Sequence, residues 1–201
     1  MAKEKNNIER RNYAYPVSVT GKEDSRTVEG YASLYDVSSD GLPFEEIIER
    51  GAFDGVIEVS NVFALLNHDQ SRGVLARSKK GVGTLTLELD DKGLKYRFEA
   101  PKTALGDELL EYLRRGEISE SSFAFTVEKE TWEEKEDGTW KRTIHKVRKL
   151  YDVSPVFDAA YSATSVDLRG KEAAEASLRA QKERVAEMED YYSTFKKIIN
   201  F

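Results

Sequence analysis

The chain contains two histidines and no cysteine, so a hydroxyl is the nucleophile that it can offer. A serine at its ordinary pKa is a poor nucleophile and needs a neighbouring base, often a histidine oriented by a third group. His68 follows an apolar run in the stretch LLNHDQSRGV, whereas His145 lies in the charged stretch KRTIHKVRK and resembles a surface residue. His68 is therefore the candidate base, although its pattern also fits an exposed loop histidine, and Asp69 beside it fits a turn residue.

The serines that could act as the nucleophile lie in the stretch ISESSFAFTV, which leads into an aromatic strand. Ser119, Ser121 and Ser122 have suitable chemistry, but they also fit turn and cap residues at a junction between a helix and a strand. A serine and a histidine so far apart in sequence give weak support for a catalytic pair. The residue pattern alone therefore leaves the reaction open.

Other kinds of site find little support in the sequence. Two histidines in such unlike contexts do not make a set of metal ligands, and the GxxxxGK[ST] and GxSxG motifs are absent. The net charge of −6 argues against a surface that coats nucleic acid. No stretch approaches the roughly 18 apolar residues of a membrane span, and the N-terminus does not resemble a secretory signal. We predict no metal and no cofactor, and no nucleic acid or membrane as a partner.

These side chains need a scaffold, and the residue pattern predicts three regions. Residues 1–12 are polar and form a flexible lead, residues 13–169 form a strand-rich domain, and residues 170–201 form a helical tail. In the tail, Leu178, Val185, Tyr192 and Ile199 recur every seven residues, which is typical of a coiled-coil seam. We expect this helix either to pack on its own domain or to bind a partner.

Strands dominate the predicted domain. Alternating apolar residues at 84–90 and 94–98 predict a hairpin, and residues 121–132 and 140–153 predict a longer hairpin with a charged tip. A further strand is predicted at 26–36. Thr103 is expected to cap a helix that carries a leucine stripe and ends at Gly116, and a shorter helix is expected at 52–58.

Five segments, taken in order, resemble the prohead (capsid maturation) protease family of tailed bacteriophages, which are serine proteases related to the herpesvirus assemblins. The segments are VEGYASLYDV, IIERGAFDG, VFALLNHDQSRGVLARS, ELLEYLRRGEISESSFAF and LYDVSPVFDAAYSATSVDLR, and they span roughly residues 27–169. No single motif is decisive, and their shared order carries the resemblance. It implies an α+β fold with a mainly antiparallel, closed β-barrel-like core and flanking helices, to which the long C-terminal helix is added.

The resemblance also suggests catalytic residues. The family's histidine falls on His68 and its serine on Ser122, with Ser121 as the adjacent alternative. Alternation along the strand favours Ser122, because Ser121 points with the phenylalanines toward the expected core. The family's acidic residue before the VSPV element falls on Asp152, which would orient the imidazole. The assemblins use a second histidine instead, which makes His145 the runner-up.

The function implied by the resemblance is a serine endopeptidase that cleaves scaffold or capsid-protein delta segments, and also itself, in a procapsid in the host bacterial cytoplasm. Its partners would be the major capsid protein, the scaffold or delta segments and further copies of itself, since assemblins act as dimers. Two alternatives stay open: a non-catalytic procapsid scaffold or adaptor that acts through the helical tail, and a small esterase-like hydrolase. Glu120, Ser121 and Ala124 depart from the family pattern, and the donors of an oxyanion hole stay unassigned.

Overall fold

The computed structural model describes residues 8–13, 16–22, 24–38 and 42–157, together with residues 175, 176 and 179. Contacts divide the chain into two compact units, Met1–Ala163 and Thr164–Phe201. The predicted long C-terminal helix at 170–201 lies outside the described residues, apart from those three positions, which are helical. The lead predicted at 1–12 ends in a strand, β1 (Glu9–Tyr13).

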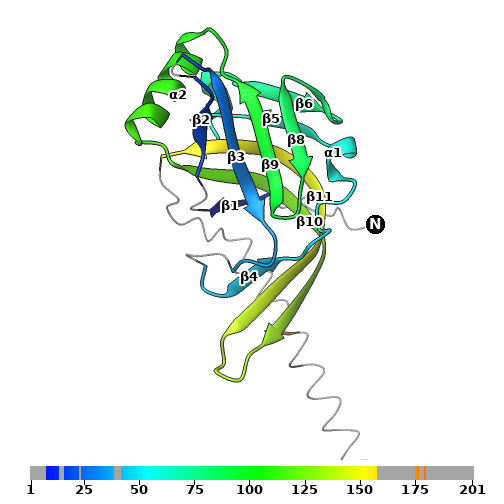
Figure 1. The fold of residues 1–201 in the computed structure, drawn as a ribbon. Helices are drawn as coiled ribbons and strands as arrows, with labels where there is room; N and C mark the ends of the chain where they lie inside the picture. Colours follow the sequence, from blue (N-terminus) through cyan, green and yellow to red (C-terminus); the bar gives the residue numbers. More distant parts are fainter. Residues whose placement is uncertain are drawn as a thin grey trace, which may run out of the picture. The chain divides into compact units, whose positions relative to one another are not determined.

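In the described part of the first unit, the strands form two hydrogen-bonded sheets (Figure 1). The larger, seven-stranded sheet follows the path β1, β10 (Glu120–Glu134), β11 (Trp140–Val156), β5 (Asn61–Ala64), β6 (Ala76–Lys79) and β7 (Val82–Gly83), while β4 (Glu45–Ile48) pairs with β11. The smaller sheet has the order β2 (Ser18–Thr20), β3 (Thr27–Leu34), β9 (Gly93–Glu99) and β8 (Leu85–Leu89).

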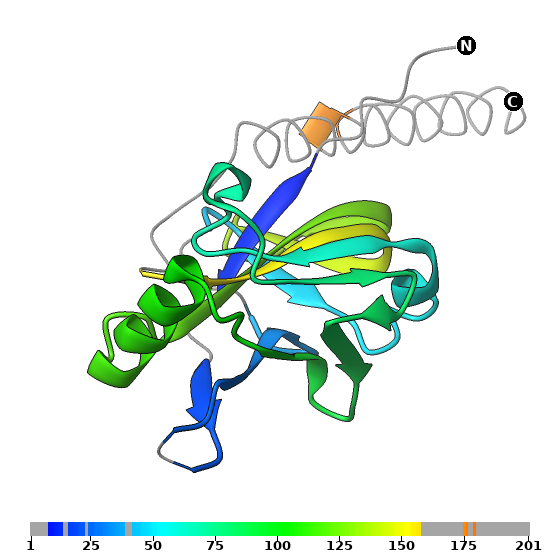
Figure 2. The same cartoon turned by 90° about the horizontal axis from the view of Figure 1, so that it is seen from above.

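The predicted closed barrel is therefore wrong, because no strand pairing joins the two sheets within the described residues. The sheets instead form two layers (Figure 2) and contribute apolar side chains to one core. Tyr96 and Phe98 enter it from the smaller sheet, and Phe123 and Phe125 enter it from the larger one. Alternating apolar residues show that each strand buries one face, but they do not show which sheet edges join, so they fit layers and barrels equally.

The strongly patterned elements lie where the sequence predicts them. The strand at 26–36 is β3, and the two hairpins are β8–β9 and β10–β11. The helix is α2 (Ala104–Arg115), in which the Thr103 hydroxyl accepts a hydrogen bond from the Gly106 N–H and Gly116 ends the helix with a left-handed φ of 74°. The shorter helix, α1 (Val56–Val59), begins later than predicted, after turns at 50–55.

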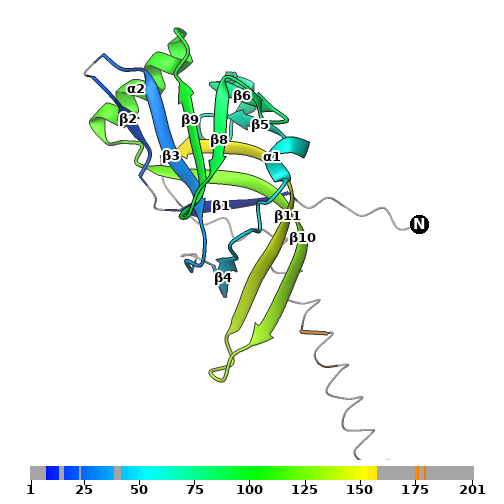
Figure 3. The ribbon, with the colours of Figure 1, turned by 45° about the vertical axis from the view of Figure 1, so that its right-hand side comes forward.

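Strands β10 and β11 extend beyond the rest of the larger sheet as a two-stranded arm (Figure 3). Register shifts between Ala124 and Glu130 interrupt the regular ladder, and such bulges bend a strand pair. Residues 141–144 of β11, which directly follow the tip of the hairpin, pair in parallel with β4. A single hairpin thus extends from the core, where it carries both Ser122 and Asp152, to the arm.

Candidate active site

Strands β10 and β11 bring Ser122 and Asp152 to the same face of the larger sheet. In their antiparallel register, Ser122 lies opposite Ser154 and Ala124 lies opposite Asp152. Residues two apart on a strand share a face, so Ser122 and Asp152 are diagonal neighbours across the pair. The longer predicted hairpin therefore supplies two of the three side chains that the sequence singled out.

His68 reaches this face from the end of β5. That strand runs parallel to β11, with Phe63 opposite Asp152 and Ala64 opposite Val153. The chain then turns through Asn67 and His68, whose φ values of 54° and 59° lie in the left-handed region, and the Asn67 N–H donates to the Pro155 carbonyl at 3.0 Å. The parallel pairing and this turn together position the imidazole beside Asp152.

The three side chains form a continuous hydrogen-bonded series. His68 Nε2 lies 2.5 Å from Ser122 Oγ, and His68 Nδ1 lies 2.5 Å from Asp152 Oδ1. The carboxylate can only accept, so Nδ1 carries the proton and Nε2 is free to accept one from the serine hydroxyl. Such a series activates a hydroxyl as a nucleophile, because the imidazole can take its proton while the carboxylate orients the ring.

Ser154 also belongs to this cluster, although the sequence analysis did not single it out. Its buried hydroxyl donates to Asp152 Oδ1 at 2.7 Å, so the same carboxylate oxygen accepts hydrogen bonds from both Ser154 and His68. Ser154 lies two residues after Asp152 on β11, so the period-two alternation of a strand could have identified it as a neighbour on the same face.

Ser121 points to the opposite side of β10, into the core. Its hydroxyl lies 2.7 Å from the hydroxyl of Tyr96, which is itself buried. Burial raises the pKa of the Tyr96 phenol, so this group stays protonated. A side chain at Gly30 would meet this pair, because a Cβ there would lie 3.0 Å from Tyr96 Oη and 3.1 Å from Ser121 Oγ. Ser121 is thus tied into the packing between the sheets, whereas Ser122 contacts the imidazole.

The remaining candidates from the sequence lie in other interactions. The ring nitrogens of His145 contact Glu49 Oε2 at 2.7 Å and Thr131 Oγ1 at 2.9 Å, so the structure does not bring this histidine to Asp152 or Ser122. Asp69 accepts hydrogen bonds from the backbone and side chain of Ser71 and so caps η1 (Gln70–Arg72). Asp69 is the turn residue that its pattern also allowed.

The described residues contain no group of three or more histidine, aspartate or glutamate side chains arranged to hold a metal ion. None of their helices is both long and apolar enough to span a membrane.

Comparison with known proteins identifies a family model and a similar solved structure. The family model described as caudovirus prohead serine protease matches residues 14–194. Among curated proteins, none matches this chain. Among solved structures, the bacteriophage T4 capsid assembly protease is similar at 11% sequence identity and a TM-score of 0.49, over 75% of this chain and 98% of that one.

Proposed function

The chain belongs to the caudovirus prohead serine protease family, and from this premise we propose that Ser122, His68 and Asp152 are its catalytic triad. The observation that carries the proposal is the position of the imidazole, which lies 2.5 Å from the serine hydroxyl on one side and 2.5 Å from the carboxylate on the other. The family supplies the reaction class, and these contacts supply the roles.

In the first half of the proposed reaction, Ser122 Oγ attacks the carbonyl carbon of the scissile peptide bond while His68 Nε2 takes the hydroxyl proton. The resulting tetrahedral intermediate collapses when the imidazolium returns that proton to the amine, which leaves as the new N-terminus. The acyl group stays on Ser122 as an ester. A water molecule then attacks the ester, with His68 again as the base, and releases the new carboxylate and the free serine.

Asp152 has two tasks in this scheme. Its Oδ1 accepts the Nδ1 proton of His68, which fixes the tautomer that leaves Nε2 able to accept. It also stabilises the positive charge that the ring carries after it takes the serine proton. Ser154 donates to the same oxygen and so restrains the carboxylate in the orientation that the ring requires.

The substrates that we propose are scaffold or capsid-protein delta segments, and the protease itself, within the procapsid in the host bacterial cytoplasm. Membership of a family of prohead serine proteases supports this substrate class. We also propose that the protein acts as an oligomer of identical copies.

The test of the proposal compares two neighbouring serines. Ser122→Ala removes the hydroxyl beside His68 and should abolish cleavage of scaffold, capsid-protein tails and the protein itself. Ser121→Ala is the matched control, because it removes the adjacent hydroxyl that contacts Tyr96 instead, and it should leave cleavage in place. Circular dichroism would confirm that both variants are folded.

Three outcomes would contradict the proposal. Wild-type cleavage by Ser122→Ala would exclude this serine as the nucleophile. A wild-type protein that stays intact, cleaves no capsid protein and yet alters capsid assembly would act as a scaffold or adaptor. Turnover of chromogenic esters without any cleavage of capsid-protein tails would indicate an esterase.

A further inference from the structure

The N-terminal strand β1 lies directly alongside the proposed nucleophile. It pairs antiparallel with β10 from Glu9 opposite Phe125 to Tyr13 opposite Ser121, and Asn12 lies opposite Ser122. The other edge of β10 is paired with β11. Strand β1 therefore occupies the one edge of β10 that an incoming strand could otherwise use next to Ser122.

Ser122 is inaccessible in this arrangement. Its relative exposure is 0%, and the exposures of the His68 and Asp152 side chains are only 14% and 9%. A peptide carbonyl must contact Ser122 Oγ for the reaction to begin, so part of the chain around this serine has to move. An extended peptide that adds to a sheet edge gains main-chain hydrogen bonds along its length, which is a common way for proteins to hold peptides.

We infer that the edge of β10 beside Ser122 is where the substrate strand docks, and that β1 occupies this edge as an internal substitute for the substrate. The inference rests on the proposed function, because it assigns a binding edge to that same nucleophile. It implies that β1 must leave β10 before a substrate can be cut.

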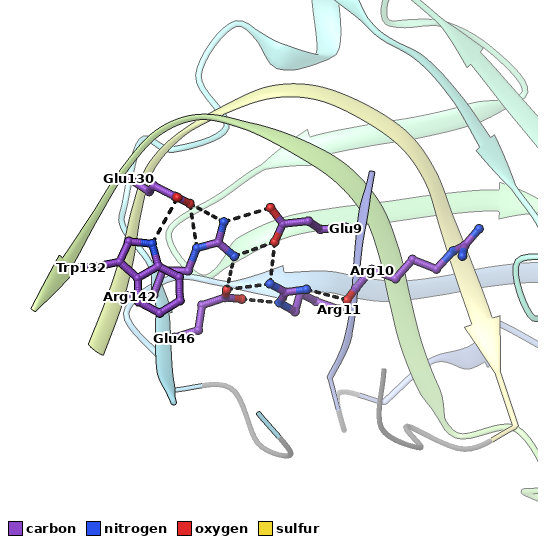
Figure 4. A network of polar contacts seen from close by, with 7 residues as sticks. All are labelled: Glu9, Arg10, Arg11, Glu46, Glu130, Trp132 and Arg142. Carbon is purple, nitrogen blue, oxygen red and sulfur yellow. Dashed lines mark hydrogen bonds and ion pairs between the residues drawn. The ribbon is translucent and has the colours of Figure 1, made fainter. Parts of the chain in front are cut away.

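The side chains of β1 suggest the chemistry of the segment that replaces it. Glu9 and Arg11 point into a buried ionic cluster with Glu46 of β4 and Arg142 of β11 (Figure 4). Arg11 contacts both carboxylate oxygens of Glu46, at 2.6 and 2.8 Å, and Arg142 contacts both carboxylate oxygens of Glu9, at 2.6 and 2.9 Å. Arg10, between them in sequence, points away from the cluster and is exposed.

The cluster has partners that do not depend on β1. Arg142 Nη1 lies 2.8 Å from Glu46 Oε2, and Arg142 also contacts Glu130 of β10. Burial lowers the pKa of Arg142, but the hydrogen bonds that it donates to Glu9 and the negative charges of Glu46, Glu9 and Glu130 raise that pKa above its ordinary value. When β1 leaves, Arg142 and Glu46 still neutralise each other, so the departure of β1 does not leave either charge buried without an opposite charge beside it.

The substrate class follows from this geometry. A segment that takes the place of β1 presents alternate side chains to the cluster, because residues two apart share a face. It should carry an acidic side chain that meets Arg142 and, two residues later, a basic side chain that meets Glu46. The basic residue immediately precedes the residue that lies opposite Ser122, as Arg11 precedes Asn12.

The first experiment weakens β1 at its exposed position. Arg10→Pro removes an N–H and imposes a φ that suits a strand poorly, while Arg10→Ala is the matched control that keeps the strand. We expect Arg10→Pro to react with a fluorophosphonate at Ser122 and to cleave capsid-protein tails at least about fivefold faster than Arg10→Ala. Unchanged or lower rates would overturn the inference, and lower rates would point to the free edge of β1 as the docking edge.

The second experiment fixes β1 in place. The chain has no cysteine, so the double variant Arg10→Cys/Ala124→Cys introduces a single possible disulfide across a directly opposed pair of the β1–β10 ladder. The oxidised form should lose cleavage, and a reductant should restore it in the same sample. Equal cleavage by the oxidised and reduced forms would overturn the inference. If neither form nor the wild type cleaves any peptide, the proposed function has failed instead.

The third experiment measures binding without catalysis. A fluorescent peptide with the sequence of residues 6–16, NNIERRNYAYP, should bind the double variant Ser122→Ala/Arg10→Pro more tightly than it binds Ser122→Ala, as read by anisotropy. A peptide with the glutamate and the second arginine exchanged should bind at least about tenfold more weakly, because it sets like charges against each other in a buried site. Equal affinity of the two peptides would overturn the charge recognition.

Discussion

At the scale of single residues, the site depends on which face of a strand each side chain takes. Ser121 and Ser122 are neighbours with the same hydroxyl, yet one contacts Tyr96 in the core and the other contacts His68. A strand reverses its side chains at every residue, so one position decides between a packing role and the catalytic role that we propose. The same rule places Ser154 beside Asp152.

The carboxylate of Asp152 provides the first prediction at this scale. In Asp152→Asn the amide can donate to His68 Nδ1, which favours the tautomer whose Nε2 carries a proton and cannot accept one from Ser122. We expect kcat to fall by about 10⁴-fold, as in other serine proteases with this change. His145→Ala is the control, since that ring contacts Glu49 and Thr131, and it should keep kcat within a small factor of the wild-type value.

Ser154 provides a second prediction, as a residue that positions Asp152. Ser154→Ala removes one of the two hydrogen bonds to Asp152 Oδ1, so the carboxylate should hold the imidazole less firmly. We expect kcat to fall by about tenfold with KM unchanged, in line with the loss of one hydrogen bond to a charged group. Ser78→Ala is a matched control, because the buried Ser78 hydroxyl has no hydrogen-bond partner among the described residues. A parallel rise in KM would indicate a disturbed binding site instead.

At the scale of elements, the buried ionic cluster connects four strands that pack side by side. Glu9 and Arg11 come from β1, Glu46 from β4, and Arg142 from β11, while Glu130 adds the contact from β10. Sheet pairing alone leaves β1 and β4 with few ladder partners. Their charged side chains therefore contribute to fixing them on the β10–β11 hairpin.

The cluster yields a prediction for stability. Arg142→Met leaves the buried carboxylates of Glu9 and Glu46 with Arg11 as their remaining shared guanidinium, so their two negative charges are only partly neutralised. Breaking a buried ionic group in this way costs about 3–5 kcal/mol of the free energy of unfolding. Urea denaturation followed by circular dichroism should show a large fall in the midpoint. Lys135→Ala breaks the exposed ion pair with Glu45 on the arm and should leave the midpoint where it is. Equal midpoints for the two variants would contradict this account.

At the scale of the whole molecule, the parts that the sequence predicted are those with local causes. The alternation at 84–90 and 94–98 gives β8 and β9, and Thr103 and Gly116 mark the ends of α2, because neighbouring residues determine these features. Long-range pairing has no such local signal. The residue pattern therefore could not predict three features: how the sheet edges join, the parallel pairing of β4 with β11, and the strand at Glu9–Tyr13.

The residues of the candidate site likewise divide into those that local sequence signals indicated and those that they did not. Composition pointed to a serine, and its position after an apolar run pointed to His68, but only the family resemblance singled out Ser122 and Asp152 from other serines and carboxylates. His68 and Ser122 are 54 residues apart, and no periodicity links positions at that distance. The ionic cluster could not be foreseen, because Glu9 and Arg11 lie in a stretch whose composition is typical of a flexible lead.

The short seam between β5 and β11 has a consequence for how the protein responds to stress. Two residue pairs join these strands, and together with the hydrogen bond from the Asn67 N–H to the Pro155 carbonyl they hold His68 against the hairpin that carries Ser122 and Asp152. Small ladders open locally at a lower cost than the whole domain unfolds. Peptide cleavage should therefore disappear at a lower urea concentration than the far-ultraviolet dichroism does, and coincident curves would contradict this expectation. An enzyme built this way would lose its activity while most of it is still folded, and would regain that activity as soon as the denaturant is diluted.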